Sequence, residues 1–134
     1  MLHILLVEDS DADILAIREG LRKAPVAADV FIARDGEEAI RMIKEIKPDF
    51  VFLDVNLPKL DGLVVLEHYR TVENAPPVIM LTGSSRESDQ QRAMDLGARE
   101  YIVKPLSYSA FLTMVHDVVK RWGAITASSK AAPE

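Results

Sequence analysis

Five short apolar runs recur along the chain, and a longer amphipathic stretch separates each from the next. The runs are HILLVE, DVFIA, DFVFLD, PVIML and EYIVK. Their length and their Val, Ile, Leu and Phe content are typical of β-strands, and several are almost continuously apolar, as strands buried on both faces are. Strands joined by right-handed helical crossovers lie parallel, with helices on both faces of the sheet. The pattern predicts a doubly wound α/β fold with a five-stranded parallel sheet.

Capping residues mark the starts and ends of the intervening helices. Side chains that accept a hydrogen bond from the first helical turn favour helix starts, and glycine favours helix ends. On this basis Ser10 or Asp11 caps a helix through Lys23, Asp35 caps one through Ile46, Ser107 caps one through Arg121, and Gly97 ends the helix before EYIVK.

The last segment differs from the rest. GAITASSKAAPE, from Gly123 onward, is small and polar and has no apolar periodicity with which to bury a face. We expect residues 1–122 to form the domain and residues 123–134 to be a flexible tail, with no output domain.

The bulk composition excludes several classes of protein. The chain has 134 residues, 49% of them hydrophobic, which suits one domain with a sizeable core. No run approaches the ~20 apolar residues of a membrane span, and the first residues turn acidic at once, so we expect a cytoplasmic protein. A formal charge of −5 disfavours binding to nucleic acid or to an anionic membrane, and the absence of cysteine removes thiolate chemistry.

The residues that end the predicted strands form a charge-matched set. The first strand ends in Glu8 and Asp9, the third in Asp54, the fourth in Thr82 and the fifth in Lys104. Ligands of such sheets bind beyond the carboxyl ends of the strands, where these side chains would meet. Taken singly, Asp9 could cap a helix, and Asp54 and Thr82 could be turn residues. Their joint placement at one edge of the sheet favours a site.

The chemistry of this set suits phosphoryl transfer. Crowded carboxylates require a cation, and Mg²⁺ prefers oxygen ligands, here Asp9 and Asp54 directly, Glu8 through water, and a nearby backbone carbonyl. A carboxylate is also a competent nucleophile toward phosphorus, which makes Asp54 the natural acceptor. Lys104 would supply a fixed positive charge and Thr82 a hydrogen-bond donor to the phosphoryl oxygens.

These motifs resemble the bacterial two-component receiver family, the CheY-like domains, over nearly all of residues 2–122. The matching segments are LLVEDS, FLDVNLPKLDG, MLTGSS and YIVKPL. The resemblance implies strand order 2-1-3-4-5, Asp54 as the phosphoacceptor, and a metal (Mg²⁺, or Mn²⁺) held by Glu8, Asp9, Asp54 and the backbone carbonyl of Asn56. It further implies that Thr82 and Lys104 contact the phosphoryl group.

The resemblance also implies a switch and an unusual peptide bond. Tyr101 matches the aromatic residue that moves inward as Thr82 is drawn toward the phosphoryl group, although a half-buried strand tyrosine is the alternative. A cis peptide is implied before Pro105. Two departures, Asn56 in place of an acid and Gly83 directly after Thr82, remove no required group, and Asn56 and Ser84 are expected to tune the lifetime of the aspartyl phosphate.

The family works with sensor histidine kinases and downstream protein targets, and it is not a class of conventional enzymes, since its members promote their own phosphorylation and dephosphorylation. LVEDSDADILAIREGL, ARDGEEAI and the last helix with Trp122 resemble single-domain regulators that partner bacterial phytochrome kinases. The output surface implied is the fourth helix, fifth strand and fifth helix.

The last helix carries more apolar residues than are needed for one core-facing stripe. Leu112, Met114 and Val119 lie beyond the face formed by Phe111, Val115, Val118 and Trp122. We expect a homodimer through this helix, with Leu112, Val119 and Trp122 in its face. A wide stripe shared with the preceding helix is the alternative.

Four other classes of protein fit less well. A haloacid-dehalogenase phosphatase requires a second Asp, its general acid, two residues after the nucleophilic Asp, and this chain has Asn56 there. A histidine phosphotransfer protein needs an exposed His on a helical bundle, and a flavodoxin-like carrier needs a phosphate loop that VEDSDAD would repel. A pseudo-receiver, which no longer takes a phosphoryl group, is disfavoured by the intact site set.

Overall fold

The structure is a computed structural model that describes the backbone of residues 1–131 and the side chains of residues 1–125. Its strands are β1 (Leu2–Val7), β2 (Ala28–Ala33), β3 (Phe50–Leu53), β4 (Val78–Thr82) and β5 (Glu100–Val103). Its helices are α1 (Asp11–Lys23), α2 (Gly36–Ile46), α3 (Gly62–Tyr69), α4 (Glu87–Asp95) and α5 (Tyr108–Ala131). Strand and helix alternate throughout, as predicted.

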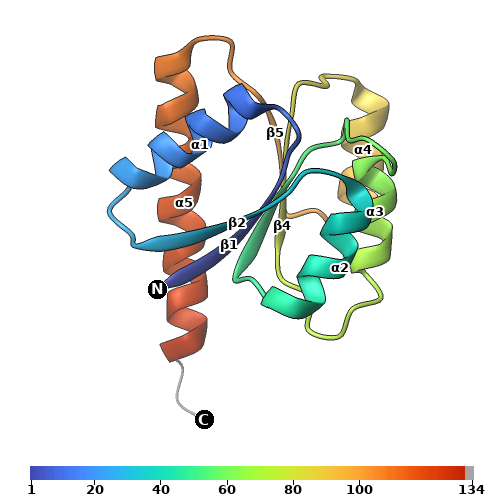
Figure 1. The fold of residues 1–134 in the computed structure, drawn as a ribbon, viewed down its shortest axis with the longest axis horizontal. Helices are drawn as coiled ribbons and strands as arrows, with labels where there is room; N and C mark the ends of the chain where they lie inside the picture. The colour runs from blue at the N-terminus through green and yellow to red at the C-terminus, as the bar shows by residue number, and fades with distance from the viewer. Residues whose placement is uncertain (132–134) are drawn as a thin grey trace.

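The strands form one parallel sheet in the order β2-β1-β3-β4-β5. Helices α1 and α5 cover one face of the sheet, and α2, α3 and α4 cover the other (Figure 1). Successive residues of a strand point to opposite faces. Accordingly Ile4 and Leu6 join the core under α1 and α5, while Leu5 and Val7 join the core under α2 and α3. The predicted fold class and strand order are confirmed.

Short polar side chains begin the helices that follow β1 and β2. The Ser10 hydroxyl accepts a hydrogen bond from the Asp13 N–H (3.3 Å), and the Asp35 carboxylate accepts one from the Glu38 N–H (2.8 Å). Each cap satisfies a donor that the first helical turn leaves without a partner. The Ser10 cap starts α1 directly beyond the end of β1, and so fixes the turn that carries the first acidic residues.

No start or end residue was predicted for helix α3, although the alternating pattern implied a helix between β3 and β4. Its sequence, GLVVLEHY, opens with a short apolar run that a strand could also contain. In the structure the Asp61 carboxylate accepts a hydrogen bond from the Leu63 N–H (2.7 Å) and begins the helix. The Asp61–Gly62 pair is therefore a helix start.

Helix α5 is longer than expected. It continues to Ala131, beyond the predicted end at Arg121, so residues 123–131 are helical, and a flexible tail without an output domain stays a prediction. Alanine favours helix and extending an existing helix costs little, so a segment without apolar periodicity can remain helical. Gly123 is also buried, and a Cβ there would stand 3.0 Å from Leu2. Residues 132–134, the rest of the expected tail, lie outside the described residues.

The expected dimer face on α5 is largely buried within the chain itself. Val119 is 0% exposed and Trp122 is 9% exposed, and both belong to the core that α5 shares with α1 and the sheet. Only Leu112 is partly exposed. Val119 and Met114 therefore widen an internal stripe, which α5 shares with α1 rather than with the preceding helix α4, and placing Val119 and Trp122 in a dimer face was wrong. Within the described part of the chain, no helix has the length and apolar character needed to span a bilayer.

Candidate functional site

The five site residues predicted from the strand ends lie at one end of the sheet. Glu8 and Asp9 follow β1, Asp54 follows β3, Thr82 ends β4 and Lys104 follows β5. These four strands are neighbours in the sheet, so their carboxyl ends converge. Glu8, Asp54 and Thr82 are buried. Burying such polar groups is costly unless they are paired, so their contacts decide what the site can do.

Lys104 lies at the centre of the site. Its Nζ donates hydrogen bonds to Asp13 Oδ2 (2.7 Å) and Asp54 Oδ2 (2.9 Å), and it also contacts Glu8 Oε1. Burial by itself would lower the pKa of Lys104, but the hydrogen bonds that the ammonium donates to Asp13, Asp54 and Glu8 outweigh this effect and raise that pKa. The ammonium is therefore a permanent positive charge beside the Asp54 carboxylate.

Glu8 is the most deeply buried acid of the site, with 2% of the residue exposed. Its Oε2 accepts hydrogen bonds from the N–H groups of Asp9 (3.0 Å) and Ser10 (3.1 Å). Burial raises the pKa of Glu8 to about 7, and the nearby Asp54 charge adds to the rise, against the opposing effect of Lys104. Its protonation therefore changes within the physiological range.

Three carboxylates fit a hard cation. One oxygen from each of Glu8, Asp9 and Asp54 lies within 4.8 Å of the others. Oxygen-only donors with several negative charges suit Mg²⁺ or Mn²⁺ and do not suit softer metals. Asp9 is exposed, so the cluster is open to solvent on one side and can admit an ion. These observations support the predicted ligands Glu8, Asp9 and Asp54.

The loop after β3 is closely packed against Asp54. The Asn56 N–H donates to Asp54 Oδ1 (3.0 Å), and the Gly62 N–H donates to the Val55 carbonyl (2.7 Å). A Cβ on Gly62 would stand 1.9 Å from the Asp54 carbonyl oxygen, so only glycine fits there. The loop therefore orients the Asp54 carboxylate. The metal-binding role of the Asn56 carbonyl stays a prediction.

A hydrogen-bonded chain runs from Thr82 to Tyr101. Thr82 Oγ1 accepts from the Ser84 N–H (3.2 Å), and the Ser84 carbonyl accepts from the Tyr101 hydroxyl (2.9 Å). The Ser84 hydroxyl donates to Asp89 Oδ2 of α4 (2.6 Å). Burial raises the pKa of Tyr101, so its hydroxyl keeps the proton that it donates. Tyr101 is thus linked to Thr82, as a switch requires, and its movement stays a prediction.

Two residues of these networks were missed in the sequence. Asp13 was overlooked because it lies within a helix, although it follows Asp9 by four residues and so occupies the first turn that faces the strand ends. Asp89 was overlooked because nothing in its segment, ESDQQRAMD, marks it as different from other surface acids. Only the fold brings Asp89 to Ser84.

The expected cis peptide before Pro105 is not present. Among the described residues every peptide bond, including Lys104–Pro105, is trans. The prediction rested on the resemblance alone, and trans is the isomer favoured by about 0.5–1 kcal/mol for such bonds. This prediction was wrong for the structure, although Lys104 reaches the site as expected.

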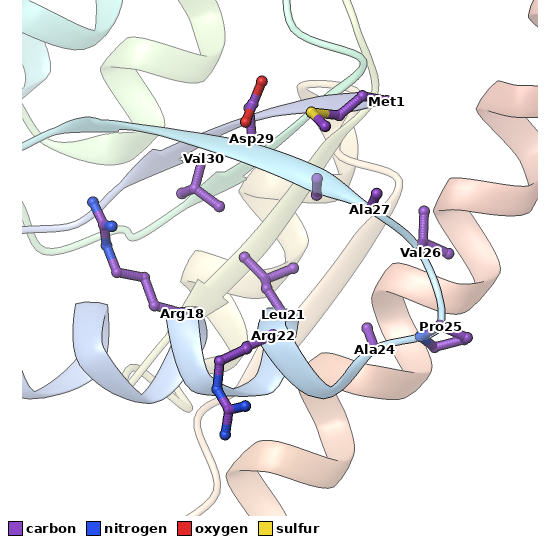
Figure 2. A pocket seen from close by; sticks show the side chains of 11 residues that line it. Met1, Arg18, Leu21, Arg22, Ala24, Pro25, Val26, Ala27, Asp29 and Val30 are labelled. Carbon is purple, nitrogen blue, oxygen red and sulfur yellow. The ribbon is translucent and has the colours of Figure 1, made fainter.

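A separate hollow of about 770 Å³ lies at the opposite end of the sheet. Figure 2 shows Leu21 of α1 and Val30 of β2 pointing into the space between these two elements, with Arg18 and Arg22 nearby. Asp29 is the only acid in its lining. The hollow lacks the convergent polar groups of the strand ends, so it does not compete with them as a site of phosphoryl chemistry.

Known proteins share both the sequence and the fold. The family description "Response regulator receiver domain" matches residues 4–116. The transcriptional regulatory protein PrrA of Mycobacterium leprae is 37% identical over 126 residues, which are 93% of this chain and 53% of PrrA. The alkaline phosphatase synthesis regulator PhoP of Bacillus subtilis is 36% identical, over 88% of this chain and 48% of PhoP. The chain thus spans about half the length of the curated relatives it matches.

Solved structures of similar size superpose on nearly the whole chain. The phosphorylated cyanobacterial phytochrome response regulator RcpA has a TM-score of 0.85 and 35% identity, covering 90% of this chain and 93% of RcpA. The Mn²⁺-bound form of the response regulator Rcp1 has a TM-score of 0.84 and 31% identity, covering 91% and 94%. With this fold, these strand ends and these relatives, the chain belongs to the response regulator receiver domain family.

Proposed function

We propose that Asp54 accepts a phosphoryl group from a sensor histidine kinase in a reaction that depends on Mg²⁺. The observation that carries the proposal is the position of the buried Asp54 carboxylate, which contacts the Lys104 ammonium and lies close to the carboxylates of Glu8 and Asp9. Receiver domains work with sensor histidine kinases, and the family membership of this chain supports that partner.

The proposed transfer is an in-line displacement. An Asp54 oxygen attacks the phosphorus of a phosphohistidine, a P–O bond forms, the P–N bond breaks and the kinase imidazole leaves. A bound Mg²⁺ or Mn²⁺ ion supplies charge neutralisation and orientation for the phosphoryl oxygens. Glu8, Asp9, Asp54 and the Asn56 carbonyl would hold that ion.

Two side chains complete the proposed site. Lys104 pairs with one phosphoryl oxygen, and the Thr82 hydroxyl donates to another, which stabilises the transferring group. Hydrolysis of the aspartyl phosphate at the same site would return the domain to its resting state, so the chain promotes its own phosphorylation and dephosphorylation without being a conventional enzyme. Asn56 and Ser84 border the site and would tune this lifetime.

The proposed output surface is formed by α4, β5 and α5. If Thr82 Oγ1 turns to the phosphoryl group, the Ser84 N–H loses its acceptor, and the loop that holds Tyr101 is released from its resting position. Helix α4 can follow this change because Ala93 is its only buried residue and no side chain caps its start. Phosphorylation would thereby shift a two-state equilibrium that a downstream protein reads.

A bacterial phytochrome is the proposed type of kinase. The structural neighbour RcpA is a phytochrome response regulator, and RPA3017 acts in red light signalling of R. palustris.

A cytoplasmic location and a homodimer through the last helix also stay predictions, and the homodimer now rests on Leu112 alone. Sedimentation that remains monomeric at high concentration, with and without beryllofluoride, would count against the dimer.

The proposed chemistry is tested by intact mass after incubation with acetyl phosphate. We expect the wild type to gain one phosphoryl group with Mg²⁺ and not with EDTA, and Asp54→Asn to gain none. A wild type that gains no mass and does not bind beryllofluoride would be a pseudo-receiver. The beryllofluoride measurement is needed because rapid hydrolysis could hide a phosphorylated product.

Metal affinity is expected to depend on pH through Glu8. Burial raises the pKa of Glu8 to about 7, so a proton occupies this carboxylate in most molecules at pH 6 and in few at pH 8. Protons and metal compete for the same oxygens, so the Mg²⁺ dissociation constant should be ~10-fold larger at pH 6 than at pH 8. Calorimetric titrations at both pH values check this. Glu8→Gln should bind Mg²⁺ more weakly and lose the pH dependence; equal wild-type constants would contradict the prediction.

A further inference from the structure

The Lys104 ammonium has three N–H bonds, and three carboxylates accept them. The acceptors are Glu8, Asp13 and Asp54, and they come from β1, α1 and the end of β3. Lysine is a point charge on a flexible four-carbon stem, so its position depends on its partners. The position of this ammonium is therefore set by three residues together, of which only Glu8 and Asp54 were predicted as site residues.

Two of these three carboxylates have a further role in the proposed site, and the third does not. Glu8 and Asp54 supply oxygens to the cluster that fits a divalent cation, while Asp13 lies outside that cluster. Asp54 also carries the phosphoryl group in the proposed function. Asp13 is thus the only one of the three whose carboxylate is not required elsewhere in the site.

Asp13 is itself held in place. It lies in the first turn of α1, its N–H donates to the Ser10 hydroxyl, and its side chain is 30% exposed. A negative charge at a helix N-terminus is stabilised by the helix dipole. This combination makes the Asp13 carboxylate a fixed anchor beside the strand ends.

Building on the proposed function, we propose that Asp13 is a positioning residue, which holds the Lys104 ammonium over Asp54 so that it meets the incoming phosphoryl group. Without Asp13 the ammonium would keep only partners that the metal and the phosphoryl group also occupy. It would then sample more orientations, and fewer of them would contact the phosphoryl oxygens.

Asp11 provides a matched control. It lies in the same first turn of α1 and carries the same charge, but it is paired with Arg34 (2.7 Å) and its side chain is 80% exposed. Asp11→Ala and Asp13→Ala therefore change the net charge and the helix start alike. Only Asp13→Ala removes a partner of Lys104.

The test is beryllofluoride binding in the presence of Mg²⁺, followed by ¹⁹F NMR or calorimetry on the full chain. We expect Asp13→Ala to raise the dissociation constant ~10-fold, as loss of an orienting partner commonly does, and Asp11→Ala to leave it within ~2-fold. Asp13→Glu, which keeps the charge, should restore part of the affinity. In a Lys104→Ala background, Asp13→Ala should have little further effect, because the two residues act as one unit.

The outcomes separate the two proposals. If the wild type binds beryllofluoride and Asp13→Ala binds it equally well or more tightly, the positioning role is wrong and the proposed function stands. The role would also be overturned if Asp13→Ala weakened beryllofluoride binding as much in the Lys104→Ala background as in the wild type. That result would show that Asp13 acts on folding or charge alone. Absence of binding by the wild type would instead refute the proposed function.

Discussion

Replacing Gly62 with alanine is expected to lower the free energy of unfolding by about 3 kcal/mol, at the upper end of the usual cost of overpacking. A Cβ at this position would stand 1.9 Å from the Asp54 carbonyl oxygen and 2.8 Å from the Val55 Cα. Both are backbone atoms, so a side-chain rotation cannot relieve the clash. The loop must move, and the hydrogen bond from the Gly62 N–H to the Val55 carbonyl would be strained or lost. Urea denaturation followed by circular dichroism measures the change.

Gly83 offers the matched control for this substitution. A Cβ there would meet nothing within 4 Å, so Gly83→Ala should change the free energy of unfolding by less than about 0.5 kcal/mol. If Gly62→Ala were as stable as Gly83→Ala, the close approach of Gly62 to Asp54 would be wrong. Because the shifted loop carries Asp54, the Gly62 variant should also bind Mg²⁺ less tightly.

Replacing Lys104 with alanine is expected to slow phosphorylation by acetyl phosphate ~10²–10³-fold, the usual cost of removing one preorganised donor to a transition state. The same change should tighten Mg²⁺ binding. The ammonium and the metal compete for the oxygens of Glu8 and Asp54, so removing one cation leaves more negative charge for the other. A time course of intact mass and a Mg²⁺ titration measure the two effects.

The Lys104 variant is expected to be phosphorylated more slowly but to bind Mg²⁺ more tightly, and these opposite effects distinguish it from a variant that has lost its structure. An unfolded variant would lose both phosphorylation and Mg²⁺ binding, whereas the Lys104 variant should lose one and gain in the other. Lys120→Ala, at an exposed position on α5, should match the wild type in both measurements. A phosphorylation rate within ~3-fold of the wild type would show that Lys104 does not contact the transferring group.

Much of the fold was predictable because the sheet is buried on both faces. Buried strands such as FVFL and VIMLT differ sharply in composition from the amphipathic helices between them, and caps such as Ser10 and Asp35 fix where two of those helices begin. The extent of α5 was not predictable in the same way. It depends on helix propensity and on the burial of Gly123 against Leu2, neither of which leaves an apolar pattern.

The site residues that lie at the ends of strands were predictable from the sequence, whereas those that lie on helices were not. Glu8, Asp9, Asp54, Thr82 and Lys104 each close a strand, so the order of the strands brings them together. Asp13 and Asp89 enter from helices, and their contacts depend on how each helix is rotated. The peptide before Pro105 depends on local energetics that the resemblance did not report.

The separation in sequence between Lys104 and its partners also has a consequence for the synthesis of the protein. Lys104 is 96 residues from Glu8, 91 from Asp13 and 50 from Asp54. A chain emerging from the ribosome cannot close contacts of this range until β5 has followed the other strands out. A nascent chain that carries Asp54 but not yet Lys104 would thus lack the positive charge that the proposed phosphorylation of Asp54 uses. Under the proposed function, this domain can accept a phosphoryl group only after synthesis has passed Lys104.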